Sequence, residues 1–157
     1  YPSSEQMSEI AISAARVVRL FGFDPKVAFV SHSTFGQPLT SRTKHIKKAV
    51  DILKEKNVDF EFDGDMQPDV ALNKDYKSLY PFSNIVGNAN ILIMPGQHSA
   101  AISYKMMKEL GDTKVIGPLL IGLGLPIEIA PLRTSTSELI NLASIAAYSA
   151  DVINYKK

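Results

Sequence analysis

Residues 3–22 carry a helical pattern of apolar positions. Ser3 and Gln6 have the spacing of a capping box, and Gly22 ends the run. The apolar positions between them recur every three to four residues, at Ile10, Ala14, Val17, Val18 and Phe21. This spacing places them on one face of a helix, so we expect an amphipathic helix at the start of the chain.

Two short apolar runs then flank a second helical pattern. Residues 26–31 form a β-branched run typical of a strand covered on both faces, and residues 58–62 form a second strand candidate. Between the two runs, helical spacing of apolar residues predicts a second amphipathic helix. Its apolar positions are Ile46, Ala49, Val50 and Leu53. Asp63 and Asp65 flank a glycine directly after the second run, which indicates a turn.

The second half of the chain repeats this alternation. Residues 66–88 are predicted to be irregular, and residues 90–94 are the clearest buried strand, followed by a helix over residues 99–110. Apolar runs predict further strands at residues 115–122 and 127–130.

A final long helix is predicted after Ser135, which forms a second capping box with Glu138. Its apolar face would consist of Leu139, Leu142, Ile145, Ala146 and Ile153.

Strands that alternate with helices along the whole length predict an α/β fold. We expect a mostly parallel sheet with helices on both faces and right-handed crossovers. No repeat, low-complexity tract or Gly/Ser-rich linker divides the sequence, so residues 1–157 are expected to form one domain. Ligands of such sheets bind beyond the carboxyl ends of the strands, and this is where functional residues are sought.

Composition narrows the function further. The 17 basic and 16 acidic side chains nearly balance, so no strong field favours nucleic acid or a charged membrane. The absence of cysteine excludes a disulfide scaffold, a thiol nucleophile and a thiolate zinc site. The longest apolar stretch, residues 115–132, is interrupted by glycines and prolines, so we expect no membrane segment. Separately, we expect a cytoplasmic location. The chain starts without Met, and we expect it to be part of a longer protein.

The loop after the first predicted strand is the best candidate for a ligand site. Ser31, Ser33 and Thr34 supply three hydroxyls and Gly36 supplies flexibility, so the loop could cradle a phosphate or a carboxylate with its hydroxyls and backbone N–H groups. The alternative is that these side chains only satisfy local backbone groups.

Each of the other polar residues could have either a functional role or a purely structural one. His32 could be a general base, but like His45 and His98 it belongs to no motif, and a surface or capping role is the alternative. Asp63 and Asp65 resemble a metal or acid–base pair in composition alone, and a turn explains them equally well.

Arg133 stands directly before the final helix. A guanidinium at a helix N-terminus is well placed to bind a phosphate, and a surface salt bridge is its alternative role.

Several separated segments resemble the C-terminal half of phosphotransacetylases, which exchange an acyl group between coenzyme A and phosphate. The segments are residues 26–36, 62–71, 90–95 and 102–105, the pair Gly117 and Pro118, and the final helix with Asn141. Residues 82–95 are most similar to the phosphotransacetylase-like domains fused behind bacterial NADP-dependent malic enzymes. The resemblance therefore implies a longer protein that converts malate to pyruvate and CO₂ with NADP and a divalent metal, both held by residues outside this chain.

The chain departs from the transferase pattern at positions that serve catalysis. Active phosphotransacetylases carry a Ser-Arg pair before the last helix and an Asp at its start, which helps to activate the coenzyme A thiol. Here the corresponding stretch runs from Pro131 to Arg133, and the acidic position is Glu138. Ile116 replaces an aromatic residue found in active members. Because a thiol needs a nearby base or cation to become a thiolate, these changes imply lost catalysis.

The resemblance implies a binding site for acyl-coenzyme A. Ser31, Ser33, Thr34 and Gly36 would line the acyl and phosphate end, Lys105 and Arg133 would bind coenzyme A phosphates, and Gly117 and Pro118 would shape the wall. No catalytic residue, metal ligand or resident cofactor is assigned to this chain.

We therefore expect a regulatory domain that binds acetyl-coenzyme A as an allosteric effector, forms dimers or higher oligomers and acts on the N-terminal malic-enzyme domains of the same chain. The first alternative is an active phosphate acetyltransferase using Glu138 and Arg133, with Ser135 or Ser137 replacing the lost hydroxyl. A purely structural dimerisation module is the second alternative.

Overall fold

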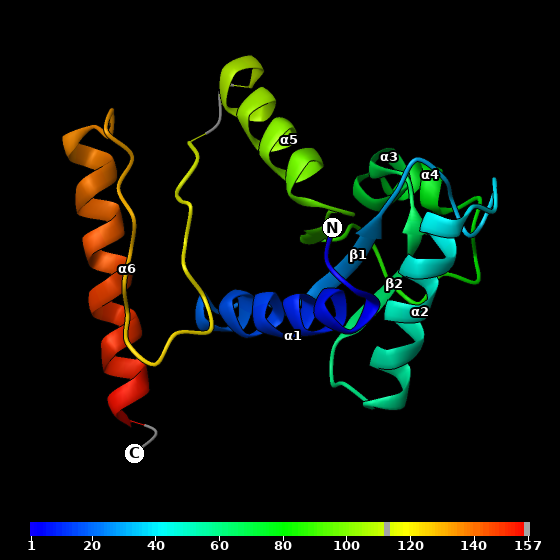
Figure 1. Ribbon diagram of the computed structural model, residues 1–157, viewed down its shortest axis with the longest axis horizontal. Coiled ribbons are helices and arrows are strands. Elements are labelled where there is room, and N and C mark those ends of the chain that lie inside the picture. Colours follow the sequence, from blue (N-terminus) through cyan, green and yellow to red (C-terminus); the bar gives the residue numbers. More distant parts are fainter. Residues whose placement is uncertain (112–113, 156–157) are drawn as a thin grey trace. The chain divides into compact units, whose positions relative to one another are not determined.

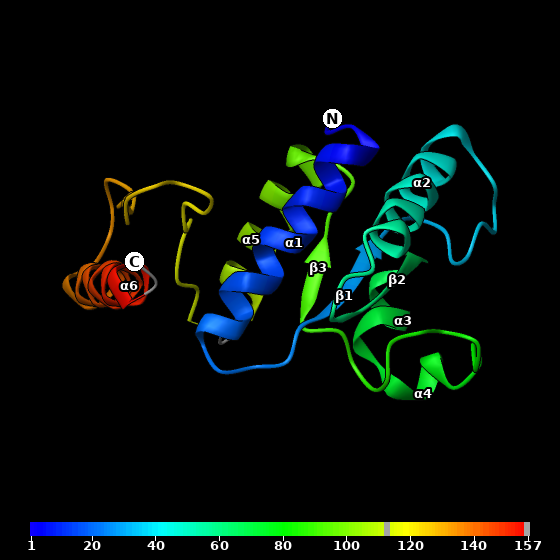
Figure 2. The same ribbon diagram turned by 90° about the horizontal axis from the view of Figure 1, so that it is seen from below.

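The computed structural model describes residues 1–111 and 114–155, with side chains to residue 151, so the predicted core position Ile153 lies outside the described side chains. The contacts of the chain divide into two compact units, Tyr1–Tyr104 and Lys105–Lys157. Figure 1 and Figure 2 label their elements. Each unit is described here by itself.

The first unit is built on a three-stranded parallel sheet. Its elements are α1 (Ser4–Leu20), β1 (Lys26–Val30), α2 (Ser41–Glu55), β2 (Glu61–Met66), α3 (Pro68–Leu72), α4 (Lys74–Lys77) and β3 (Ile91–Ile93). The strand order is β2-β1-β3, and both pairings are parallel. The predicted α/β fold with a parallel sheet is therefore confirmed.

Helices cover both faces of this sheet. Val27 and Phe29 of β1 point to the face covered by α1 and α2, where Met7 and Leu53 belong to the same buried cluster. Ala28 points to the opposite face and packs with α3 and residues 85–89. Figure 2 shows α2 and α3 on opposite sides of β1 and β2. Because β1 is buried on both faces from Val27 to Val30, its sequence is apolar over these residues, as the pattern predicted.

The helix starts agree with the sequence pattern. The side chain of Ser3 accepts from the backbone N–H of Gln6, and the Gln6 side chain accepts from the Ser3 N–H, so the predicted capping box is confirmed. Thr40 and Thr43 form an equivalent box at the start of α2. These caps satisfy N–H groups that lack a partner within the helix.

The turn predicted at residues 63–65 is wrong, because these residues belong to β2. Ala28 and Phe29 of β1 lie opposite Asp63 and Gly64 in the parallel ladder. A Cβ on Gly64 would lie 2.7 Å from the Cβ of Phe29, so only glycine allows the two strands to approach this closely. The predicted strand at residues 58–62 is therefore displaced toward the C-terminus.

The region predicted to be irregular, residues 66–88, contains α3 and α4. Pro68 occupies the first turn of α3, where its missing N–H costs nothing. Lys77 at the end of α4 is buried, and its Nζ donates to the carbonyl of Gly87 at 2.7 Å. Burial lowers the pKa of Lys77, while the carboxylates of Asp63 and Glu61 oppose this shift.

The second unit contains the end of α5 (Gln97–Leu110), a connecting segment and α6 (Thr136–Tyr155). The strands predicted at residues 115–122 and 127–130 are wrong: in the described part of this segment, the only β pairing is one bridge between Leu119 and Glu128. Pro118 lacks the N–H that a ladder requires, and Gly117 has a φ of 135°, which interrupts an extended strand.

The final helix begins as predicted. The Oγ of Ser135 accepts from the Glu138 N–H at 3.3 Å, and the Glu138 carboxylate accepts from the Ser135 N–H at 2.7 Å, which confirms the capping box. On the predicted apolar face Leu142 is buried, whereas Leu139 is exposed. Among the helices built from described residues, none is long and apolar enough to cross a bilayer.

Candidate functional site

The loop after β1 forms a tight turn at residues 34–37. The N–H of Thr34 donates to the carbonyl of Gln37 at 3.3 Å, and the Gln37 N–H donates back at 3.1 Å. The two central residues, Phe35 and Gly36, have φ values of 50° and 79°. This combination is typical of the two-residue hairpin turn that needs positive φ at both central positions. Glycine adopts it freely, but phenylalanine does so only when other contacts hold it.

Asp65 of β2 provides those contacts. Its carboxylate accepts from the hydroxyl of Ser33 and, at 3.0 Å, from the N–H of Gly36. Its carbonyl accepts from the N–H of Phe35 at 2.6 Å. Asp65 is 3% exposed and Ser33 is fully buried. The conformation of the turn therefore depends on a carboxylate that lies about thirty positions away in the sequence.

The remaining polar groups of the loop are also used internally. The hydroxyl of Thr34 accepts from the N–H of Gln67 at 3.2 Å, and the Oγ of Ser31 accepts from the Ser33 N–H at 3.3 Å. Each N–H from residue 33 to residue 37 thus has an acceptor within the first unit. The bond to Ser31 matches the interpretation in which a side chain satisfies local backbone, whereas the bond to Thr34 comes from a residue 33 positions away. The loop can offer a ligand a defined surface, but it does not offer a row of open N–H groups.

The ring of Phe35 joins an aromatic cluster. Its centroid lies 5.5 Å from that of Tyr80 and 4.8 Å from that of Phe82. Sequence reasoning missed this cluster, because the three rings come from two loops separated by more than forty residues. A hollow of about 470 Å³ lies beside the turn, between residues 35–39, α2 and β2. A ligand can therefore reach the turn from outside.

The other candidates in the first unit have structural partners. The carboxylate of Asp63 accepts from the N–H of Asn84 at 2.7 Å, so Asp63 and Asp65 hold different segments instead of forming a pair. The ring of His45 lies within 3.1 Å of the Ser4 hydroxyl, whereas His32 is exposed. In the ranges that the structure describes, no three histidine or acidic side chains gather to hold a metal ion.

The second unit contains a small pocket of about 90 Å³ at the start of α6. It brings together three of the predicted site residues, Gly117, Arg133 and Glu138. Lys105 and Pro118 are exposed and do not line it. Lys108, which the sequence analysis did not select, does line it. The sequence did offer a signal for Lys108. It lies three residues after Lys105 in α5, so both lysines lie on neighbouring parts of one helix face.

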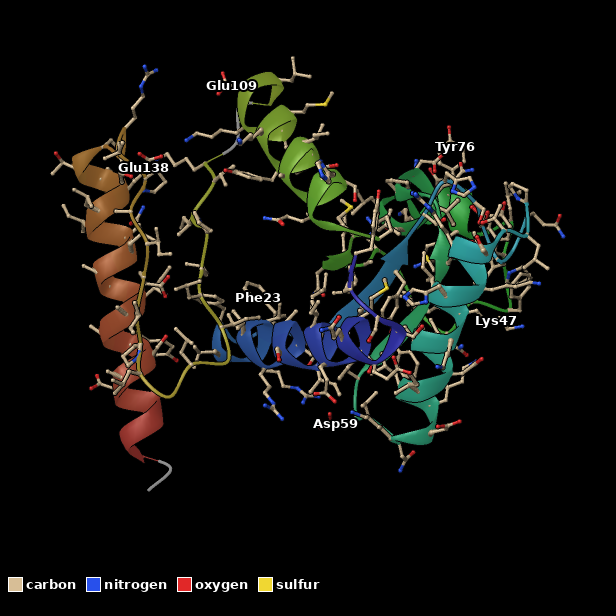
Figure 3. The ribbon with its side chains drawn as sticks, viewed as in Figure 1. Phe23, Lys47, Asp59, Tyr76, Glu109 and Glu138 are labelled. Carbon is tan, nitrogen blue, oxygen red and sulfur yellow. The ribbon has the colours of Figure 1, made fainter. Side chains whose placement is uncertain are left out.

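Glu138, labelled in Figure 3, lines this pocket, and both of its carboxylate oxygens have partners. Its Oε2 accepts from the backbone N–H and the hydroxyl of Ser135 at 2.7 and 2.8 Å, and its Oε1 lies 3.5 Å from the Nζ of Lys108. The hydrogen bond from the Ser135 N–H is the main cause that lowers the pKa of Glu138. A carboxylate with a lowered pKa is a weaker proton acceptor. Arg133, which is exposed, also lines this pocket.

Comparison with known proteins gives a consistent result. The model of the family described as phosphate acetyl/butaryl transferase matches residues 1–147. An NADP-dependent malic enzyme from Rhizobium meliloti is 48% identical over 95% of this chain and 20% of its own length. A phosphate acetyltransferase from Clostridium acetobutylicum is 34% identical over 95% of this chain and 45% of its own length.

The fold has the same relatives. A solved phosphotransacetylase from Staphylococcus aureus superposes with a TM-score of 0.88 at 30% identity, over 96% of this chain and 47% of that protein. The chain therefore spans less than half of the transferases and about a fifth of the malic enzymes that it matches.

Proposed function

Because this chain belongs to the phosphate acetyl/butaryl transferase family, we propose that it binds acetyl-coenzyme A as a regulatory domain of a bacterial NADP-dependent malic enzyme and does not transfer the acyl group. The family match confirms the resemblance found in the sequence. Under this proposal the longer protein converts malate to pyruvate and CO₂ in the cytoplasm. It uses NADP and a divalent metal bound outside these residues.

The state of Glu138 is the observation that carries the proposal. Acyl transfer from phosphate to coenzyme A requires a group that removes the thiol proton. Glu138 stands at the position that the resemblance assigns to the acidic group, but its carboxylate accepts hydrogen bonds from Ser135 and lies 3.5 Å from the Nζ of Lys108, and its pKa is lowered. Ser135, which could have replaced the missing hydroxyl, donates to this same carboxylate. The groups needed for thiol activation are thus committed to capping α6.

Binding of a coenzyme A phosphate remains chemically reasonable at this end of α6. Arg133 and Lys108 both line the pocket, and Lys108 pairs with the Glu138 carboxylate at 3.5 Å. Guanidinium and ammonium groups bind phosphate through charge-assisted hydrogen bonds. Lys105, Gly117 and Pro118 would complete this part of the binding surface, and the outer side of Ser31 to Gly36 would meet the acyl and phosphate end.

Regulation requires acetyl-coenzyme A to bind one arrangement of the protein more tightly than another. We propose that this arrangement involves contacts between this chain and the malic-enzyme domains, and between copies of the protein in a dimer or higher oligomer. Such coupling is reciprocal, so malate or NADP would change the affinity for acetyl-coenzyme A by the same factor.

The test uses the full-length protein. Calorimetry should show saturable binding of acetyl-coenzyme A, and the rate of malate oxidation should change when acetyl-coenzyme A is added. The double variant Lys105→Ala, Arg133→Ala should weaken binding by at least about tenfold per lost phosphate contact. The matched control Lys44→Ala, Lys74→Ala removes the same charge at exposed positions and should leave the affinity within about twofold.

A coupled assay with acetyl phosphate and coenzyme A tests the alternative that the protein is an active phosphate acetyltransferase. Formation of acetyl-coenzyme A at the rate of an enzyme would show an active phosphate acetyltransferase and overturn the proposal. If acetyl-coenzyme A does not bind at all, a structural dimerisation module becomes the better description.

A further inference from the structure

We propose that Asp65 is a positioning residue that sets the shape of the ligand-facing turn at residues 34–37 by taking the donors that an anionic ligand would otherwise use. This inference rests on the proposed function, because it concerns the loop assigned there to the acyl and phosphate end of acetyl-coenzyme A.

The first argument is the chemistry of the contact. The hydroxyl of Ser33 and the N–H of Gly36 converge on the two oxygens of one buried carboxylate. A hydroxyl and a backbone N–H that point to one place are the donors that bind a phosphate or carboxylate ligand. In this loop they are occupied by a side chain of the protein itself. Under this proposal the outer surface that these bonds create meets the acyl end of the ligand, and the phosphates of the coenzyme A moiety bind to cations elsewhere.

The second argument is the conformation of the turn. Phe35 has a positive φ, which an L-residue adopts at a cost. The bond from its N–H to the carbonyl of Asp65 and its ring contacts with Tyr80 and Phe82 hold it there. Asp65 thus binds the loop at three residues, Ser33, Phe35 and Gly36. No other residue outside the loop makes as many of its described hydrogen bonds.

The neighbouring carboxylate provides a control within the same strand. Asp63 is 6% exposed against 3% for Asp65, and both lie in β2. Asp63 accepts from the N–H groups of Gly64 and Asn84, and no hydrogen bond described for its carboxylate involves the loop. Replacing either carboxylate by an amide removes one buried charge and leaves a donor without its charged acceptor. Both carboxylates line the hollow beside the turn, but only the change at Asp65 alters a carboxylate that is hydrogen-bonded to the loop.

The experiment compares Asp65→Asn with Asp63→Asn in the full-length protein. Affinity for acetyl-coenzyme A is measured by calorimetry, and amide hydrogen exchange is measured for the peptide that contains residues 33–37. We expect Asp65→Asn to weaken binding at least fivefold and to speed exchange in this peptide at least tenfold. Asp63→Asn should change both by less than twofold. Equal effects of the two variants on affinity would overturn the positioning role.

Ser33→Ala is the second variant, and it keeps the proposal testable if Asp65→Asn fails to fold. It removes one donor to the carboxylate and should act in the same direction with a smaller effect. In a double-mutant cycle, Ser33→Ala should change the affinity of the Asp65→Asn protein by less than it changes that of the wild type, whereas full additivity would contradict the proposal. Unaltered hydrogen exchange in these variants would also contradict it. Absence of acetyl-coenzyme A binding by the wild type, with exchange accelerated as expected, would reject the proposed function while retaining the role of Asp65 in shaping the turn.

Discussion

The turn at residues 34–37 and the pocket at the start of α6 use a carboxylate in opposite ways. Asp65 is buried and binds donors from a loop remote in the sequence. Glu138 is half-buried and binds Ser135 three residues away, with Lys108 beside it. In the first place the carboxylate determines the shape of a loop. In the second place it caps a helix and leaves an exposed arginine, Arg133, available to a ligand.

This difference indicates where substitutions should affect protein stability most. A buried group that binds several distant partners contributes to folding and to the geometry of the site together. An exposed group in a local cap contributes less to folding, because water replaces part of what it loses. Changes around the turn are therefore expected to cost more stability than changes at the pocket.

The largest effect is expected for Gly64→Ala. The new Cβ would lie 2.7 Å from the Cβ and 2.8 Å from the carbonyl oxygen of Phe29, and the residue has a φ of 151°. Overpacking and an unfavourable φ together should lower the free energy of unfolding by about 4 kcal/mol. The control is Gly124→Ala in the second unit, where no atom lies within 4 Å and a change below about 0.5 kcal/mol is expected. Chemical denaturation measures the free energy of unfolding of the two variants. An equal loss of stability in both would contradict the expected difference between the two positions.

Phe35 offers a way to separate packing from backbone strain in the turn. Phe35→Ala should lose about 2 kcal/mol, because the half-buried ring loses its contacts with Tyr80 and Phe82. Phe35→Gly loses the same contacts but adopts a φ of 50° freely, so it should be more stable than the alanine variant by about 1 kcal/mol. Thermal unfolding of the two proteins provides the measurement. An alanine variant that equals or exceeds the glycine variant would show that the turn carries no strain.

Ser135→Ala examines the local cap at the pocket. Loss of an N-cap serine should lower stability by about 1 kcal/mol, which is less than the change expected at Phe35. The variant also removes the Ser135 hydroxyl from Glu138, so the pKa of Glu138 should rise toward its ordinary value. Because this pKa is lowered in the folded protein, its stabilising effect is present above the ordinary value and is lost as the pH falls through the lowered one. NMR titration of the carboxyl should show the rise, and a pKa that stays unchanged would exclude the hydroxyl as a cause.

The smallest effect is expected at the exposed pair of Glu5 and Lys48. Their side chains lie 2.8 Å apart, and the hydrogen bond from Lys48 is the main cause that lowers the pKa of Glu5 to about 2. The stabilisation is complete above pH 4.5 and is lost as the pH falls toward 2. Lys48→Ala should return the pKa of Glu5 toward 4.5, and 1 M salt should have part of this effect. Salt should affect Glu138 less, since a backbone N–H is the main cause of its lowered pKa. NMR titration of Glu5 and Glu138 at low and high salt checks that the pKa of Glu5 changes more with salt than the pKa of Glu138.

Local patterns in the sequence predicted the parts of the fold that depend on neighbouring residues. The capping boxes at Ser3 and Ser135 were predicted because each joins residues three positions apart. The buried strand at residues 26–31 was predicted because both of its faces are covered, which leaves an apolar run. These features require no knowledge of distant partners.

The errors arose where the partner is distant. From the sequence, Asp63 and Asp65 resemble turn residues. In the structure both lie in β2, where their carboxylates accept hydrogen bonds from Asn84 and Ser33, which are distant in the sequence. The apolar run at residues 115–122 has the composition of a strand, but composition does not supply a pairing partner. The candidate loop was located correctly at the end of β1, whereas its dependence on Asp65 could be seen only in three dimensions.

The internally bonded turn after β1 also has a thermodynamic consequence. Because the N–H groups of residues 33–37 already have acceptors, the loop has little conformational entropy left to lose when a ligand arrives. The entropic penalty of association at this loop should then fall mainly on the ligand. Discrimination between acyl groups would accordingly depend on how well each one fits a surface that does not adjust to it.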